Sequence, residues 1–226
     1  MSAEGPYGNG GAAADMLNAF EIAALVYDDG VSVDDLLGYF AGELKDSGCR
    51  IGGVVQLPPE DHSKKSDKLR VYDLMSGDTF PVKQQLGPGS DACSLDTRAL
   101  AEASMRIRRA VDLGVDLVFI SKFGKQEAAG SGFRDEFAYA VAAGVPVITS
   151  VRRQLVPEWL TFTGGIGTLL ACRLKVVREW WTETEGRRKK LQAAREAEAA
   201  LARRRLASAA PSPVADNVVR LSDYIG

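Results

Sequence analysis

Residues 22–30 read Ile22-Ala23-Ala24-Leu25-Val26-Tyr27-Asp28-Asp29-Gly30, an unbroken apolar run that ends in an acidic turn. Such a run is typical of a strand buried on both faces, as parallel sheets require. Ser32 then fits the N-cap of a helix whose first turn is acidic, and Gly48 fits its end. Residues 51–57 form the next apolar run. Strand, helix and strand within roughly 35 residues predict a βαβ unit.

The rest of the chain continues this alternation. Residues 69–74 and 79–84 flank a Ser76-Gly77-Asp78 turn and predict a hairpin at an edge of the sheet. Further elements are expected as helix from 96 or 97 to 113, strand 116–121, helix 133–143, strand 145–151, a short helix ending at Gly164-Gly165, and helix from about 167 to 210 with a break at Gly186. The pattern predicts a three-layer α/β fold with a mostly parallel sheet, an edge hairpin and a long C-terminal helix.

Length and charge limit the class of protein. The chain of 226 residues carries a formal net charge of −2, which argues against a dedicated nucleic-acid binder. Residues 173–206 hold eleven Lys or Arg and five Glu, a net charge of +6, so the remainder carries −8. This asymmetry predicts a separate role for the C-terminal part. The expected organisation is a flexible N-terminus over 1–19, an α/β domain over 20–181, a basic helical extension over 182–210 and a tail over 211–226.

The three cysteines and the hydropathy pattern indicate the compartment. Cys49, Cys93 and Cys172 are odd in number and far apart, which argues against a secreted disulfide framework. The sequence contains no transmembrane-length apolar stretch, and residues 1–15 lack the basic start of a signal peptide. We therefore expect a cytoplasmic protein without a membrane partner.

The turn after the first strand is a candidate ligand loop. A Walker A loop, G-x-x-x-x-G-K-[ST], needs a lysine on the phosphates and a hydroxyl on magnesium. Residues 27–35 keep Gly30 and Ser32 but have no lysine, and they add four carboxylates, among them Asp28 and Asp29. Three interpretations stay open: a strand-to-helix turn with an acidic cap, a carboxylate site for a cation or a hydroxyl-bearing ligand, and a degenerate phosphate loop.

The loop over residues 121–134 is a second candidate. It brings the cations Lys122, Lys125 and Arg134 to the end of a buried strand. Glycines such as Gly124 allow backbone amides to turn towards a ligand. A charge at the end of a buried strand must find a partner or bind a counter-ion. The alternatives are a set of surface ion pairs and an anion-binding site.

Single residues elsewhere give weaker signals. Cys93, just before an expected helix, fits either a structural cysteine or a ligand contact, and no spacing in the chain predicts a metal site. His62 lies among polar residues and is expected to be solvated. Gln56 ends the second strand, at the sheet edge where open α/β folds bind ligands.

Several segments together resemble a bacterial family of unknown function in the P-loop superfamily. They are residues 51–56, 86–96, 122–128, 132–136, 144–147 and 162–165. Members of that family resemble archaeal-type nucleoside triphosphatases and the guanine-dinucleotide adaptor protein of molybdenum cofactor synthesis. The resemblance extends over about residues 22–181 and implies a P-loop-NTPase-like fold. It also implies an accessory or regulatory role near molybdenum transport and nitrogenase functions.

The resemblance and the residues support three hypotheses. The first is a non-hydrolysing binding protein for a small anion such as molybdate, or for a nucleotide, with Lys122, Gly124, Lys125 and Arg134 on the anion and Gln56 and Cys93 lining the pocket. The second is a divergent nucleoside triphosphatase with Glu127 as general base. Against it, Ser121 and Lys122 stand where related enzymes hold magnesium with carboxylates. The third is an interaction module that acts through residues 186–226, with a homodimer as a further alternative.

Overall fold

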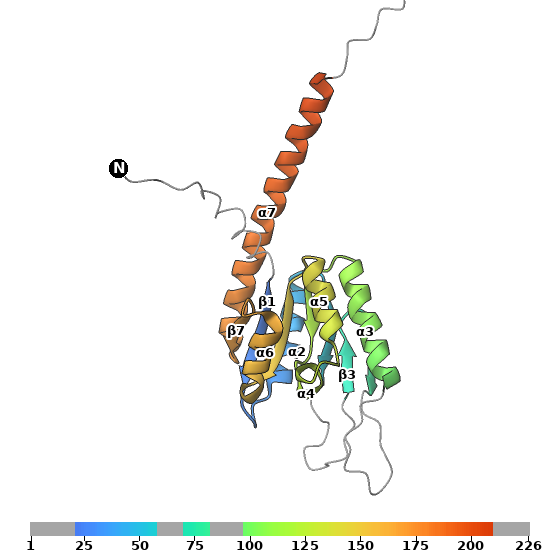
Figure 1. Ribbon diagram of the computed structural model, residues 1–226, viewed down its shortest axis with the longest axis vertical. Helices are drawn as coiled ribbons and strands as arrows, with labels where there is room; N and C mark the ends of the chain where they lie inside the picture. The colour runs from blue at the N-terminus through green and yellow to red at the C-terminus, as the bar shows by residue number, and fades with distance from the viewer. Residues whose placement is uncertain (1–20, 58–69, 82–96, 210–226) are drawn as a thin grey trace, which may run out of the picture. The chain divides into compact units, whose positions relative to one another are not determined.

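The computed structural model describes residues 21–57, 70–81 and 97–209, and its core is a seven-stranded sheet (Figure 1). The strands are β1 Ile22–Tyr27, β2 Ile51–Gln56, β3 Arg70–Asp73, β4 Thr79–Pro81, β5 Leu117–Ile120, β6 Val147–Arg152 and β7 Thr168–Ala171. The α-helices are α2 Val33–Asp46, α3 Thr97–Asp112, α4 Lys125–Ala128, α5 Arg134–Ala142, α6 Val156–Thr163 and α7 Leu174–Ala209, and a 3-10 turn, η1, spans Arg153–Leu155. The chain divides into two compact units, Met1–Thr182 and Glu183–Gly226.

The strand order is β4-β3-β2-β5-β6-β1-β7. The pairs β2·β5, β5·β6, β6·β1 and β1·β7 are parallel, whereas β2·β3 and β3·β4 are antiparallel. The expected α/β fold with a mostly parallel sheet and an edge hairpin is therefore confirmed. The carboxyl ends of the five parallel strands share one edge of the sheet.

Side chains alternate between two cores, one on each face of the sheet. In β5, Val118 and Ile120 join a core built with α3, α5 and α6, while Leu117 and Phe119 join a core built with α2 and the first turns of α7. All four side chains of this strand are fully buried. Helices on both faces explain why the central strands are apolar without alternation, as the sequence indicated.

Two expectations for the C-terminal third are wrong. The segment expected to be helical from about residue 167 contains β7, which pairs in parallel with β1. It lies at the edge of the sheet, and only Leu170 of its four residues is buried. Its sequence therefore lacks the continuous apolar run of a central strand. The break expected at Gly186 is also absent, because α7 is a single helix through that position.

Gly53 lets β2 approach β5 closely. Its φ is +90°, and a Cβ at this position would lie 2.1 Å from the carbonyl oxygen of Phe119. Its own carbonyl oxygen accepts a hydrogen bond from the amide of Leu74, in the turn of the β3–β4 hairpin. A side chain at residue 53 is therefore excluded by backbone atoms. At the neighbouring Gly52, a Cβ would instead lie 2.5 Å from the Cβ of Ala110 on α3.

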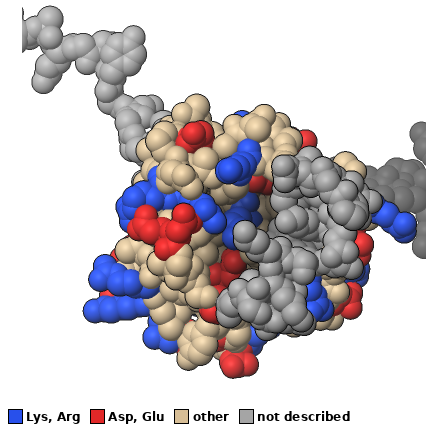
Figure 2. All heavy atoms as spheres, turned by 90° about the horizontal axis from the view of Figure 1, so that it is seen from below, with Lys and Arg blue, Asp and Glu red and all other residues tan. Residues whose placement is uncertain are grey.

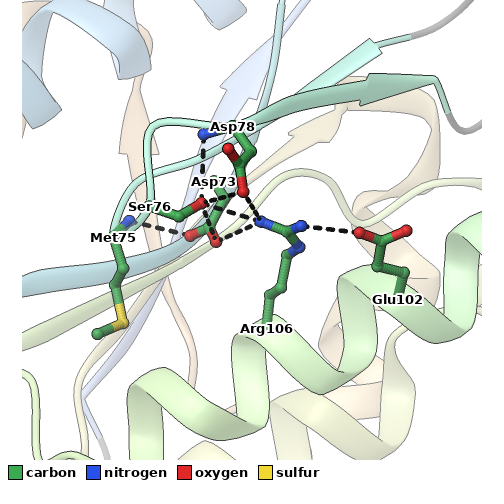
Figure 3. A network of polar contacts seen from close by, with 6 residues as sticks. All are labelled: Asp73, Met75, Ser76, Asp78, Glu102 and Arg106. Atoms are coloured by element: carbon green, nitrogen blue, oxygen red, sulfur yellow. Dashed lines mark hydrogen bonds and ion pairs between the residues drawn. The ribbon is translucent and has the colours of Figure 1, made fainter.

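A polar network holds the β3–β4 hairpin to α3 (Figure 3). Arg106 donates to Asp73 at 2.8 Å, to Asp78 at 2.9 Å and to Glu102 at 2.7 Å. Its guanidinium also lies 4.8 Å from the ring centroid of Phe80. Burial raises the pKa of Asp73, but hydrogen bonds from the Met75 amide, Arg106 and Ser76 outweigh burial and hold it below the usual range.

The second unit is described as far as Ala209 by the continuation of α7. Salt bridges at i,i+4 spacing, such as Lys189–Glu185 at 2.9 Å, line this stretch, and Leu191, Leu201 and Leu206 are exposed. Across the described ranges, no helix combines the length and the apolar character that crossing a bilayer would require.

Candidate functional site

The connections that leave β1 and β6 diverge at the carboxyl edge of the sheet. From β1 the chain passes to α2 on one face, and from the adjacent β6 it passes to α6 on the other. In open α/β sheets this is the point where ligands bind. A crevice lined by Tyr27, Asp28, Asp29 and residues 152–154 lies at this point. Two ion pairs bridge it: Asp28 Oδ1 with Arg153 Nε at 2.8 Å, and Asp29 Oδ1 with Arg152 Nη1 at 2.6 Å.

These arginines pair with two of the four carboxylates of the first candidate loop, Asp28 and Asp29. The Arg153 guanidinium makes a bidentate contact with Asp28, and its hydrogen bond holds the pKa of that carboxyl below its ordinary value. Gly30 has a φ of +86°, which completes the tight turn. In the described part of the chain, no three His, Cys, Asp or Glu side chains are grouped as a metal ion would need.

Ser32 occupies the expected N-cap position of α2, but it does not cap the helix with its side chain. Its hydroxyl donates instead to the carboxylate of Asp35 in the first turn. The start of α2, where a phosphate-binding loop would present backbone amides, is thus lined by the chain's own carboxylates, Asp34 and Asp35.

A cavity of about 570 Å³ opens at the ends of β2, β5 and β6. It is bounded by Gln56 at the end of β2, by residues 121–127 after β5, and by Arg152, Gln154 and Leu155 after β6. Most of its lining surface is apolar. Ser121 also lines it; this residue is 5% exposed, and its hydroxyl forms no hydrogen bond of ordinary geometry among the described residues, although it lies near enough to Asp34 to lower the pKa of that carboxyl. An unsatisfied buried hydroxyl at a cavity wall offers a contact for a ligand.

Asp34 links the two sides of the site. Gln56 Nε2 donates to Asp34 Oδ2 at 3.0 Å, and Lys122 Nζ lies 3.5 Å from the same oxygen. The other carboxylate oxygen, Oδ1, is buried and has no partner in the described ranges. Burial therefore raises the pKa of Asp34, an effect that Lys122 partly offsets. Lys122 also lies 5.6 Å from the ring centroid of Tyr27.

Glu127 organises the loop after β5 from within. Its Oε2 accepts a hydrogen bond from the Gly124 amide and its Oε1 accepts one from the Phe133 amide, each at 2.9 Å. Only 5% of the residue is exposed. Both carboxylate oxygens are therefore engaged by backbone donors of the same loop.

The remaining cations of this loop point in different directions. Lys125, the first residue of α4, is exposed and lines the cavity, and the described residues offer it no ion-pair partner. Arg134 instead donates to the carbonyl oxygen of Glu127 at 2.9 Å and stacks 4.4 Å above the ring centroid of Phe162. It does not line the cavity.

The structure thus groups part of the predicted site. One cavity is surrounded by Gln56, Lys122, Gly124, Lys125 and Glu127, whereas Asp28 and Asp29 line the neighbouring crevice and Gly30 follows them in the turn. Cys93 and His62 lie outside the described residues. Figure 2 looks onto this edge and shows basic and acidic side chains interspersed.

Sequence reasoning missed the roles of Asp34, Arg152 and Arg153. Arg152 is the last residue of the buried strand β6 and Arg153 follows it, so the rule that singled out Lys122 would also have singled them out. Asp34 gave no such signal, because an acidic residue in a first helical turn is common on electrostatic grounds alone.

The chain is an α/β domain with a cavity at the carboxyl edge of its sheet, and comparisons with known proteins give its family. A model of a family of proteins of unknown function, DUF2478, matches residues 22–180, so the chain belongs to that family. The molybdenum import ATP-binding protein ModC 2 of Bradyrhizobium diazoefficiens is 44% identical over 171 residues, which cover 76% of this chain and 19% of that protein. The solution structure of a human cancer-related nucleoside triphosphatase matches with a TM-score of 0.49 at 16% identity, over 67% of this chain and 88% of that one.

Proposed function

We propose that this chain is a non-hydrolysing accessory or regulatory domain of molybdenum metabolism that binds a small anionic ligand or a nucleotide at the carboxyl edge of its sheet. The observation that carries the proposal is the cavity of about 570 Å³, which gathers the buried hydroxyl of Ser121 and Lys125, a cation without an ion-pair partner among the described residues. A buried donor and a cation that face one cavity are suited to an anionic ligand.

Molybdenum enters the proposal through the relative. The similar segment is only 19% of the protein named as a molybdenum import ATP-binding protein. Most of that protein therefore lies outside the match, and ATP binding by it does not require that this segment bind ATP. We infer that the domain works beside an import ATPase, as a sensor or carrier of a ligand.

Two features support binding without hydrolysis. Residues 27–35 contain no lysine to hold a triphosphate. Glu127, the candidate general base, has both carboxylate oxygens occupied by the amides of Gly124 and Phe133. A base must reach the proton of an attacking water, and this carboxylate is committed to its own loop.

A thermal-shift series on the full chain tests the proposal. The ligands are molybdate, tungstate, phosphate, ATP and GTP, each with and without magnesium. Binding to the native state alone should raise the melting temperature, with a stabilisation of about 2.7 kcal/mol at a concentration near 100 times the Kd. We expect at least one ligand to stabilise without magnesium, and Lys125→Ala to lose that shift.

Lys175→Ala is the matched control, because Lys175 is 84% exposed and has only a long contact of 3.8 Å to Glu179. It should keep the full shift. The absence of any shift in the wild-type chain would remove the proposal. Stabilisation by ATP or GTP only with magnesium, together with phosphate release, would replace it with a nucleoside triphosphatase.

A further inference from the structure

We infer that the cavity takes an organic ligand with a planar ring system and a single anionic group, rather than a bare oxyanion or a polyphosphate. The inference rests on the proposed function and narrows its ligand class. Three properties of the cavity lead to it: the state of its backbone donors, the pairing of its charges, and the chemistry of its walls.

Two backbone donors of the loop after β5 are already used. A tetrahedral oxyanion needs several converging N–H groups, as glycine-rich loops provide. Here the amides of Gly124 and Phe133, which bracket the loop after β5, both donate to Glu127 at 2.9 Å. The Glu127 carboxylate already occupies the position that a bound oxyanion would take between these two amides. An oxyanion would have to displace a carboxylate that is 5% exposed and tethered to the same loop.

The charges at the cavity are nearly balanced. Lys122 lies 3.5 Å from Asp34, and Arg152 lies 2.6 Å from Asp29. Among the described residues that line the cavity, Glu127 is held by two backbone amides rather than by a cation, and Lys125 remains without an ion-pair partner. One unpaired cation suits one anionic group, whereas a triphosphate would bring several negative charges close to Asp34.

The side chains that line the cavity are suited to a planar, apolar ring system. Tyr27, Phe123 and Phe133 supply aromatic rings, and Val71, Leu100 and Leu155 supply aliphatic surface. A cavity of about 570 Å³ has the size of sites that enclose cofactor-sized organic molecules, which are mostly apolar with a few placed polar groups. Gln56, Gln154 and the Ser121 hydroxyl are the polar groups for the ring edge.

Isothermal titration of the full chain tests this inference. The probes are the four nucleoside monophosphates AMP, GMP, CMP and UMP, the triphosphates ATP and GTP, and inorganic phosphate and molybdate. We expect at least one monophosphate to bind ten times more tightly than phosphate and molybdate, and the matching triphosphate to bind more weakly than the monophosphate. Equal or tighter binding of molybdate, phosphate or a triphosphate would overturn the inference.

Two tryptophan substitutions on α3 locate the site. Leu100→Trp places a larger side chain at the apolar wall and reduces the space in the cavity, so it should weaken monophosphate binding at least tenfold. Met105→Trp, on the same helix at a residue that is 65% exposed, should change it less than twofold. If Leu100→Trp lowers the melting temperature, Leu155→Trp, at another residue that lines the cavity, replaces it. Unchanged affinity in the filled variant would also overturn the inference.

The outcomes separate the inference from the proposed function. Binding of molybdate or phosphate alone would keep an anion-binding accessory domain and remove the organic ligand. Failure of every probe to bind would remove both.

Discussion

At the scale of single residues, the loop after β5 depends on contacts with one buried carboxylate. Glu127 accepts two backbone hydrogen bonds, and Gly132 passes so close to it that a Cβ would lie 2.0 Å from Oε1. The loop therefore tolerates no side chain at residue 132. The loop is therefore shaped without a ligand, because the amides of Gly124 and Phe133 are both held by the Glu127 carboxylate.

Gly132→Ala and Gly130→Ala form a matched pair for this loop. Both glycines have positive φ, +66° and +94°, but a Cβ at Gly130 would meet nothing within 4 Å. Gly130→Ala should cost about 1–2 kcal/mol from backbone strain alone. Gly132→Ala should cost about 1–3 kcal/mol more, because it breaks the Glu127 contacts. Urea denaturation measures both; equal costs would contradict this account of the loop.

Asp34 should make the stability of the protein depend on pH. Burial raises its pKa in the folded state, so its stabilising contribution is fully present below 3.8 and is lost as the pH rises through the raised value. Asp34→Asn removes this loss. The free energy of unfolding of the variant, relative to wild type, should therefore increase from about pH 4 towards neutrality.

Asp35→Asn, an exposed neighbour in the same helical turn, is the control. Urea titrations at several pH values give the two profiles. If Asp34→Asn ran parallel to wild type over this range, the carboxyl would not be desolvated as the structure indicates.

At the scale of secondary-structure elements, the edge hairpin is held by charge as well as by pairing. Arg106→Ala should cost about 2–3 kcal/mol, because Asp73 is 5% exposed and would lose a charged partner. This estimate is below that for a fully buried pair, because 23% of the Arg106 side chain is exposed. Arg109→Ala, on an exposed position of the same helix, should stay within about 0.5 kcal/mol. Denaturation of both variants at pH 7 tests the difference, and equal stabilities would refute the role of the network.

The elements differ in how far the sequence predicts them. Buried strands such as β1 and β5 are evident because they are apolar on both faces. β7 escapes the same rule because it is an edge strand with three of its four residues exposed and runs almost directly into α7. The helix ends at Gly48 and Gly164 are predictable, because left-handed glycines end helices.

The site was predictable only where a signal was local. Lys122 and Lys125 stand out because they follow a buried strand, and both line the cavity. The Asp28–Arg153 pair joins residues 125 apart in the chain. It depends on β1 lying beside β6, and a single sequence does not give that neighbourhood.

At the scale of the whole molecule, we expect the first compact unit, Met1–Thr182, to fold and to bind ligand without residues 183–226. A chain that ends at Thr182 retains the complete sheet, both cores and the cavity. It should unfold in one cooperative transition and bind the same ligand with less than a twofold change in Kd. Calorimetry and titration of this shortened chain check both expectations.

Loss of cooperative unfolding in the shortened chain would show that residues 183–226 are part of the folding unit. Loss of binding in a cooperatively folded chain would instead place part of the site beyond Thr182. We keep residues 186–226 as the candidate segment for contact with a protein partner. A pull-down of the import ATPase of the proposed function, with the full chain and with a chain that lacks residues 186–226, tests that role.

The aromatic cluster on the α6 side of the sheet gives the protein an optical reporter. Trp159 is fully buried, and its ring meets that of Phe123 at a centroid distance of 5.2 Å and an angle of 79°. Phe123 also forms a wall of the cavity. In a Trp180→Phe, Trp181→Phe background, all indole fluorescence comes from Trp159. A ligand seated against Phe123 would then change the emission of a fluorophore that it never touches.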